Sequence, residues 1–257
     1  VHAVATFVDN VVGTIGEWAV AALVLAEIVI LFAGVVSRYV FQEPILWSDE
    51  LASILFLWLA MLGAVVALRR GEHMRMTAIV GMVSPRWRAF LDVFAMTAAL
   101  TFLALIIHPA VEFASDEVMI TTPALDISNA WRAAALPIGS GLMILTALLR
   151  MLRIGDWRLV IASVVAIGAI VGVLLGLEPV LRDLGNLNLI IFFVGIVFVS
   201  VLAGVPIAFS FGLATVGYLS ITTNVPLPVV IGRMDEGMSH LILLSVPLFV
   251  FLGLLIE

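Results

Sequence analysis

Long apolar runs alternate with short polar connections along most of the chain. The clearest run covers residues 51–68, which carry no charge and are long enough to cross most of a hydrocarbon core of about 30 Å. Asp49 and Glu50 precede this run, where negative charge favours a helix start, and Arg69 and Arg70 follow it. The pattern therefore predicts a membrane-spanning helix with charged residues at both ends.

The residues just before this run predict how the helix begins. Pro44 interrupts the preceding segment, and Trp47 stands where an indole ring can rest at the lipid–water boundary. Ser48 is expected to be the N-cap residue. Asp49 and Glu50 are adjacent and point to different helix faces, so we expect them to favour the helix start rather than form a paired-carboxylate site.

The remaining apolar runs predict an all-α integral membrane protein. We expect a helical bundle of about seven transmembrane helices plus a final hydrophobic hairpin or broken-helix segment. Residues 1–16 are expected to form a separate short interfacial helix, and Pro109 is expected to end the third span. The expected apolar segments cover residues 18–37, 51–68, 89–108, 132–151, 159–177, 186–203, 204–219 and 243–257.

Composition excludes several classes of protein. The chain is 63% hydrophobic and 12% charged, whereas a soluble domain is about half apolar and about a quarter charged. It contains no cysteine, so neither a disulfide framework nor a thiolate metal site is possible, and four scattered histidines predict no metal centre. No nucleophile–base pair or phosphate-binding loop is present. We therefore predict neither an enzyme nor a nucleic-acid partner.

The arginines predict the orientation in the membrane. Cytoplasmic connections carry an excess of basic residues, which places the turn at residues 69–75 inside, the acidic segment at residues 112–126 outside and the N-terminus in the cytoplasm. A bacterial inner membrane is the expected location. Eight arginines fall in the connections placed inside, at positions 69, 70, 75, 86, 88, 150, 153 and 158, and four fall outside, at positions 38, 132, 182 and 233.

Residues 37–75 contain an ordered set of motifs. They are SRYVF from Ser37, W-x-x-E-L from Trp47, F-x-W-L-x-x-L-G-A from Phe56 and R-R-G-x-H from Arg69. This set resembles the small membrane subunit of TRAP transporters, the DctQ-like family, and WRAAALPIGSGLM at residues 131–143 also resembles the last helix of that subunit. The resemblance implies a scaffold signature at Arg38, Trp47, Glu50, Trp58, Arg69, Arg70 and His73.

Two later apolar segments contain prolines: GVPIAFSFGLATVGYL at residues 204–219 and LLSVPLFVFLGLLIE at residues 243–257. Both resemble the start of the large membrane subunit of the same transporters, the DctM-like family. We therefore expect a Q-like part at residues 1–155 that forms a four-helix membrane scaffold. Residues 156–184 are expected to form a linker transmembrane helix, because a Q-like part with both ends inside needs one crossing before an M-like part that starts outside. Residues 185–257 would form the N-terminal portion of an M-like transport domain.

The resemblance also implies a function. Such a protein would be the membrane component of a sodium-coupled, binding-protein-dependent transporter that imports organic acid anions of the dicarboxylate or sialic-acid type. The Q-like part would brace an elevator-type M-like part in the lipid bilayer. The implied partners are a DctP-like periplasmic substrate-binding protein and the remainder of the M-like domain, with sodium as coupling ion and no other cofactor. The alternative is a membrane scaffold or assembly protein without transport activity of its own.

Three residues are candidates for a functional role within the membrane. Glu27 lies near the middle of the first span, where an ionisable group is expensive. It is interpreted either as a carboxyl that bonds a backbone or hydroxyl group of the facing M-like part, or as a proton- or ion-handling group. Ser245 and Pro247 match the S-x-P-L-F region that, in the family, neighbours a sodium site. The alternative for Pro247 is a simple helix kink.

Overall fold

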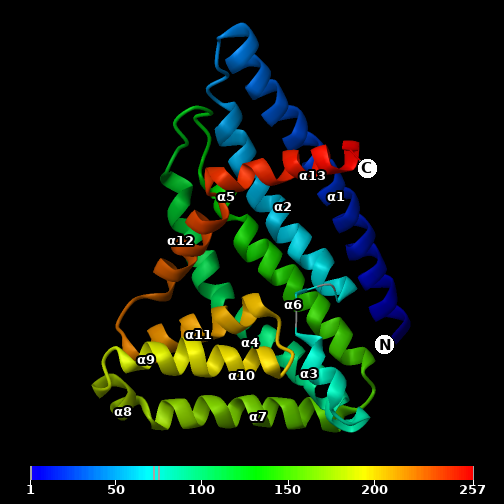
Figure 1. Ribbon diagram of the computed structural model, residues 1–257, viewed down its shortest axis with the longest axis vertical. Helices are drawn as coiled ribbons and strands as arrows, with labels where there is room; N and C mark the ends of the chain where they lie inside the picture. Colours follow the sequence, from blue (N-terminus) through cyan, green and yellow to red (C-terminus); the bar gives the residue numbers. More distant parts are fainter. Residues whose placement is uncertain (1, 72, 75, 257) are drawn as a thin grey trace.

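The computed structural model describes residues 2–71, 73–74 and 76–256 (Figure 1). The described chain is built from helices, with one isolated β-bridge between Thr121 and Ser128. Five helices are long and apolar enough to cross a membrane, which confirms an all-α, multi-pass membrane protein. These spans are Val11–Phe41, Ser48–Arg70, Pro85–Met119, Ala130–Arg153 and Trp157–Gly176.

The first two helices form an antiparallel pair with two close approaches. Helix α1 (His2–Val36) continues into the π-helix η1 (Ser37–Phe41), and α2 spans Ser48–Arg70. Gly13 lies under the Arg69 guanidinium group, and a Cβ added at Gly34 would lie 3.0 Å from the Ser48 hydroxyl oxygen. The expectation of a separate helix at residues 1–16 was wrong, because α1 runs without a break from His2 to Val36 and no proline interrupts it.

Helix α4 (Pro85–Asp116) follows the short helix α3 (Thr77–Met82) and is longer than predicted. Pro109 lies inside α4 and does not end it. A helix that stopped within hydrocarbon would leave several backbone groups unpaired, whereas a proline inside it removes one N–H donor. The helix therefore continues through Pro109 for two further turns.

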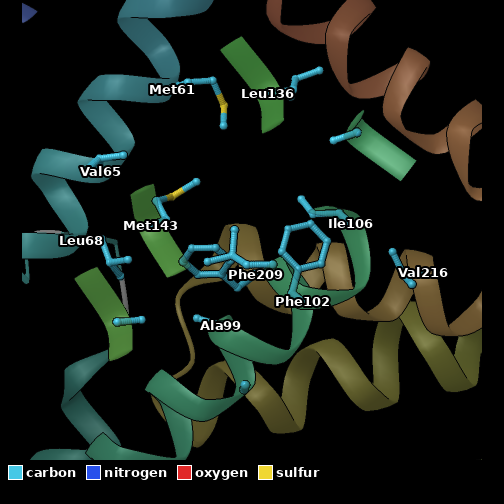
Figure 2. Packing of buried hydrophobic residues seen from close by; sticks show 14 of the residues in the cluster. Met61, Val65, Leu68, Ala99, Phe102, Ile106, Leu136, Met143, Phe209 and Val216 are labelled. Atoms are coloured by element: carbon cyan, nitrogen blue, oxygen red, sulfur yellow. The ribbon is translucent and has the colours of Figure 1, made fainter. Parts of the chain in front are cut away.

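The core lies where α2, α4 and α6 (Ala135–Arg153) meet (Figure 2). Met61 from α2, Phe102 from α4 and Met143 from α6 belong to one buried cluster. Phe209 from α11 (Ile207–Thr222) and Ile231 from α12 (Leu227–Met238) join the same cluster. Because one core serves both parts of the chain, the predicted M-like helices pack directly on the predicted Q-like helices.

The helices after residue 156 are shorter or more exposed. Helix α7 (Trp157–Gly176) packs on α4 and has Ser163 as its buried residue. Helix α8 (Glu178–Asp183) leads to an apolar segment that ends in a turn at Gly204, where φ is 86°. Pro206 follows this turn and is the N-cap residue of α11. That segment consists of α9 (Leu187–Leu189), the π-helix η3 (Ile190–Ile196) and α10 (Val197–Leu202).

The count of about seven transmembrane helices is not confirmed. The segments Leu187–Leu202 and Ile207–Thr222 are apolar but shorter than the five long helices. At 1.5 Å per residue, each is about 24 Å long, less than a hydrocarbon core of about 30 Å. Helix α12 is followed by a last segment that joins η4 (Leu241–Leu244) to α13 (Ser245–Ile256). The two are bent by 42° at a short break, the geometry of a broken span or of a re-entrant loop. The chain thus ends in a bent segment, but the bend lies between Met238 and Leu241 and not at the predicted position, Ser245 to Pro247.

Candidate functional site

The signature residue Glu50 holds the loop that follows α4. Its two carboxylate oxygens accept hydrogen bonds from the backbone N–H groups of Ala124, at 2.8 Å, and Leu125, at 2.9 Å. Its neighbour Asp49 instead pairs with Arg38 of η1, at 3.0 Å. The two carboxylates therefore bind different partners, as adjacent residues of a helix should. The exposed Arg38–Asp49 pair contributes little stability, whereas Glu50 fixes residues 120–129 over the start of α2.

Ser48 does not have the capping role that the sequence predicts. The N-cap residue of α2 is Trp47, which makes no side-chain capping bond. The Ser48 hydroxyl donates to the Ile45 carbonyl oxygen at 2.8 Å. Its side chain is buried against Gly34 of α1, and this packing turns the hydroxyl group away from the free N–H groups of the helix.

Trp58 connects α2 to the start of the fourth span. Its indole N–H donates to the Trp131 carbonyl oxygen at 2.9 Å, beside the short helix α5 (Ala130–Ala133). The side chain also packs against the core cluster. Trp58 therefore both packs in the core and bonds the backbone at the start of the fourth span.

At the opposite end of α2, the R-R-G-x-H motif contacts both parts of the chain. Arg69 and Arg70 pair with Glu17 of α1 at 3.4 and 3.1 Å. Gly71 ends α2 with φ at 72°, a conformation that favours glycine. The His73 ring lies 5.4 Å from the Phe209 ring of α11. Arg75, which belongs to the same predicted basic turn, lies outside the described residues.

The His73 side chain packs as a neutral ring rather than acting as a positive charge. Burial lowers the pKa of its imidazole below the ordinary value, so the ring is neutral at pH 7. One residue on, the Met74 carbonyl oxygen accepts a hydrogen bond from the Ile207 N–H at 3.2 Å. The turn after α2 is therefore a contact point for the first M-like residues.

A cavity of about 690 Å³ lies between the two parts. Helices α2, α4 and α6 line one side, and α11 and α12 line the other. Its lining side chains are apolar except for His73, Ser140 and Thr215. The cavity therefore does not offer the cluster of oxygen ligands that a small hard cation prefers.

Ser245 and Pro247 lie at the start of α13. The Ser245 hydroxyl donates to the Ile242 carbonyl oxygen at 2.7 Å, and Pro247 is buried in the first turn. A proline at this position removes an N–H group that has no partner within the helix in any case. The bend in the chain falls earlier, between Met238 and Leu241, so Pro247 neither breaks nor kinks a helix here. Whether Ser245 binds a cation stays a prediction.

Glu27 is fully buried in the seam between α1 and α2. Two other positions in the described part of α1 are also buried, Gly13 and Gly34. Glu27 lies fourteen residues after the first and seven before the second, and seven residues make about two helical turns. Glu27 therefore faces α2, as both glycines do. Neither of its carboxyl oxygens has a hydrogen-bond partner among the described residues. The predicted bond to the M-like part is thus not formed within residues 185–256, and the role of Glu27 stays open.

This geometry gives an expected result for Glu27→Leu. The leucine should leave the melting temperature of the purified protein unchanged or raise it by a few degrees, because burial of an unpaired polar group costs about 1–3 kcal/mol. Glu17→Leu on the same helix is the matched control and should lower it, since Glu17 pairs with Arg69 and Arg70. A larger fall for Glu27→Leu than for Glu17→Leu would reveal a bonded partner for the buried carboxyl.

One polar contact between the two parts escaped sequence analysis. Arg132 of α5 forms an ion pair with Asp235 of α12 at 2.8 Å. Three charges within four residues, at Arg233, Asp235 and Glu236, are typical of a solvated helix face. The signal that could have found the pair is the spacing from Ile231, because a residue four positions later lies on the same buried face.

Comparisons with known proteins agree with this architecture. A family model described as "Tripartite ATP-independent periplasmic transporters, DctQ component" matches residues 27–155, just over half of the chain. A second model, "Tripartite ATP-independent periplasmic transporter, DctM component", matches residues 194–257. Both models therefore match one polypeptide.

Three relatives are informative. The sialic acid TRAP transporter permease protein SiaT of Haemophilus influenzae is 28% identical over 94% of this chain and 41% of its own length. The sialic acid TRAP transporter small permease protein SiaQ of Vibrio cholerae is 26% identical over 52% of this chain and 78% of its own length. The isethionate TRAP transporter permease protein DctMQ of Oleidesulfovibrio alaskensis is 22% identical over 80% of this chain and 32% of its own length.

The chain thus spans less than half the length of SiaT and DctMQ, and these relatives are named as permeases rather than enzymes. The two family models match in the order Q then M, with residues 156–193 between them. The chain belongs to the DctQ component family of the tripartite ATP-independent periplasmic transporters and carries a DctM-component segment in the same polypeptide, as a fused TRAP transporter membrane component.

Proposed function

We propose that this chain is the membrane part of a secondary transporter that imports organic acid anions together with sodium. The observation that carries the proposal is the match to SiaT over 94% of the chain, across both the Q-like and the M-like part. The relatives are named for sialic acid, C4-dicarboxylate and isethionate, which are all anions of organic acids at neutral pH. An organic acid anion is therefore the proposed substrate class.

The Q-like part acts as the scaffold in this proposal. Helices α2, α4 and α6 form a common core with α11 and α12, so the first M-like helices rest on a large, fixed apolar surface. The rest of an M-like domain would move against this surface in an elevator-like motion and carry the substrate. The Q-like part needs no substrate contact for that role.

A periplasmic substrate-binding protein would deliver the anion to the outer face. The loop at residues 120–129 supports this role, because Glu50 holds its backbone in place over α2. A docking surface benefits from such order, since less conformational entropy is lost on binding. In this orientation the protein lies in the inner membrane, with the loop in the periplasm and the N-terminus in the cytoplasm.

Sodium coupling is tested at Ser245. Its hydroxyl donates a hydrogen bond to the Ile242 carbonyl oxygen, which leaves the lone pairs of the hydroxyl oxygen free to bind a cation. In the complete transporter, Ser245→Ala should raise the sodium concentration needed for half-maximal uptake several-fold. The measurement is uptake of a radiolabelled organic acid into proteoliposomes, in the presence of its binding protein, against external sodium. Ser220→Ala, at an exposed position of α11, is the control and should match the wild type.

The possible outcomes test the Ser245 cation site, sodium coupling and transport activity separately. If the sodium dependence of Ser245→Ala overlays that of the wild type, Ser245 is not a ligand. If wild-type uptake does not depend on sodium, the coupling proposal fails. If the wild type shows no uptake with any organic acid tested, a membrane scaffold without transport activity of its own is favoured.

A further inference from the structure

We propose that the ion pair between Arg132 and Asp235 sets the register in which the M-like part packs on the Q-like part. The Arg132 Nη2 atom lies 2.8 Å from Asp235 Oδ2. The Asp235 side chain is only 4% exposed and that of Arg132 23%, so the pair is largely removed from solvent. It joins α5, at the start of the fourth span, to α12, which lies about a hundred residues later in the chain.

Ser239 extends the pair into a small network. Arg132 Nη1 also donates to the Ser239 hydroxyl oxygen at 3.2 Å, and that hydroxyl donates to the Asp235 carbonyl oxygen at 2.7 Å. On the other side, the Ser53 hydroxyl of α2 donates to the Ser239 carbonyl oxygen at 3.5 Å. The end of α12 is thus held by polar contacts to two different Q-like helices.

The rest of this contact is apolar and does not define a register by itself. Ile231 is buried in the shared core, and Gly232 faces the Phe113 ring, where an added Cβ would lie at 3.4 Å. Apolar burial is non-directional, so α12 could repack after a shift of one residue along the Q-like surface, which turns the helix by about 100° about its axis and moves position 231 out of the contact.

The charges distinguish the two arrangements. Such a shift would separate Asp235 from Arg132 and leave a largely buried charge without its partner, which is strongly unfavourable. Asp235 Oδ1 has no hydrogen-bond partner in the part of the chain that the structure describes, so the arginine is the charge that neutralises this group. One position of α12 is therefore selected over its neighbours. A single buried polar residue, such as an asparagine in a coiled coil, specifies the register of packed helices in a comparable way.

The test uses a thiol placed under α12. The chain has no cysteine, so an Ile231→Cys thiol is unique, and its position is 1% exposed in the native register. It should react slowly with a maleimide in detergent solution. In an Arg132→Leu background the reaction should become at least tenfold faster, and in the exchanged background Arg132→Asp with Asp235→Arg it should return to within about threefold of the original rate.

Two controls separate register from general loosening. A Leu103→Cys thiol, in the Q-like core and fully buried, should stay protected in every background. Glu236→Leu, next to Asp235 on α12, should leave the Ile231→Cys thiol protected, because the Glu236 side chain is 67% exposed and pairs with Arg233 of its own helix.

Three results would overturn the proposal. The first is that Arg132→Leu leaves the Ile231→Cys thiol as protected as before. The second is that the exchanged pair is as reactive as Arg132→Leu while the Leu103→Cys thiol stays protected. The third is that the Leu103→Cys thiol becomes reactive together with the Ile231→Cys thiol, which would give the pair a general role in stability rather than a role in register. None of these outcomes depends on transport.

Discussion

Replacing Gly139 by leucine should prevent α2 and α6 from packing and leave little folded protein. A Cβ added at Gly139 would lie 2.7 Å from the Cβ of Met61, closer than carbon atoms approach in proteins. The Met61 Cβ is attached directly to the backbone of α2, so rotation of its side chain cannot relieve the clash. The helices must move apart, and the core that they share with α4 must open.

The size of the effect follows from the place of the contact. Overpacking of a core typically costs about 1–3 kcal/mol, and a complete leucine side chain at a helix–helix contact lies at or above the upper end. That is a large fraction of a typical folding free energy of about 5–15 kcal/mol. Size-exclusion chromatography of the detergent-solubilised protein should show loss of the monodisperse peak, and Gly139→Ala should lower the melting temperature without abolishing folding.

The chain supplies a matched control two residues later. Gly141 lies on the same helix, and a Cβ added there would meet nothing within 4 Å. Gly141→Leu should keep the peak and the melting temperature, because leucine has a higher helix propensity than glycine and finds open space. Equal behaviour of the two variants would mean that Gly139 is not at the contact between α2 and α6.

Sequence analysis correctly predicted the helices whose position depends only on the length of an uninterrupted apolar run. The run at residues 51–68 became α2, and the flanking Pro44 and Gly71 lie outside it. Pro109 failed as a predicted end because the rule that prolines end helices comes from water, where freed carbonyl groups are hydrated. Inside a membrane the helix is the only available arrangement over that length, so α4 continues to Asp116.

The candidate site was predicted in its residues but not in its contacts. The signature positions Glu50, Trp58 and His73 all bind other elements, and Glu50 receives two N–H groups from a loop more than seventy residues away. Such contacts arise from the tertiary fold, so no local pattern could name the partner. The same holds for Asp235, whose partner Arg132 lies on α5, about a hundred residues earlier in the chain.

The transport proposal requires a fixed orientation in the membrane. The loop held by Glu50 must face the periplasm, and the turn after α2 must face the cytoplasm. In Figure 1, the loop and the start of α2 lie together near the top, while the end of α2, α3 and the turn from α6 to α7 lie at the lower right. The arginines at that lower end favour the cytoplasm. His73 is a poor reporter of this side because it is half-buried against Phe209.

Two methionines give a matched pair of reporters. Met119, next to the loop, is 91% exposed, and Met82, at the end of α3, is 86% exposed. Because the chain has no cysteine, Met119→Cys and Met82→Cys each carry one thiol of similar accessibility on opposite ends of the molecule. Any difference in labelling between them therefore reports the side of the membrane rather than burial.

The decisive measurement is labelling of these two variants in intact cells with a membrane-impermeant maleimide. Met119→Cys should be labelled at once, and Met82→Cys should be labelled only after the inner membrane has been permeabilised. Labelling of Met82→Cys in intact cells, with Met119→Cys protected until permeabilisation, would reverse the orientation. It would also exclude residues 120–129 as the surface that receives a periplasmic binding protein.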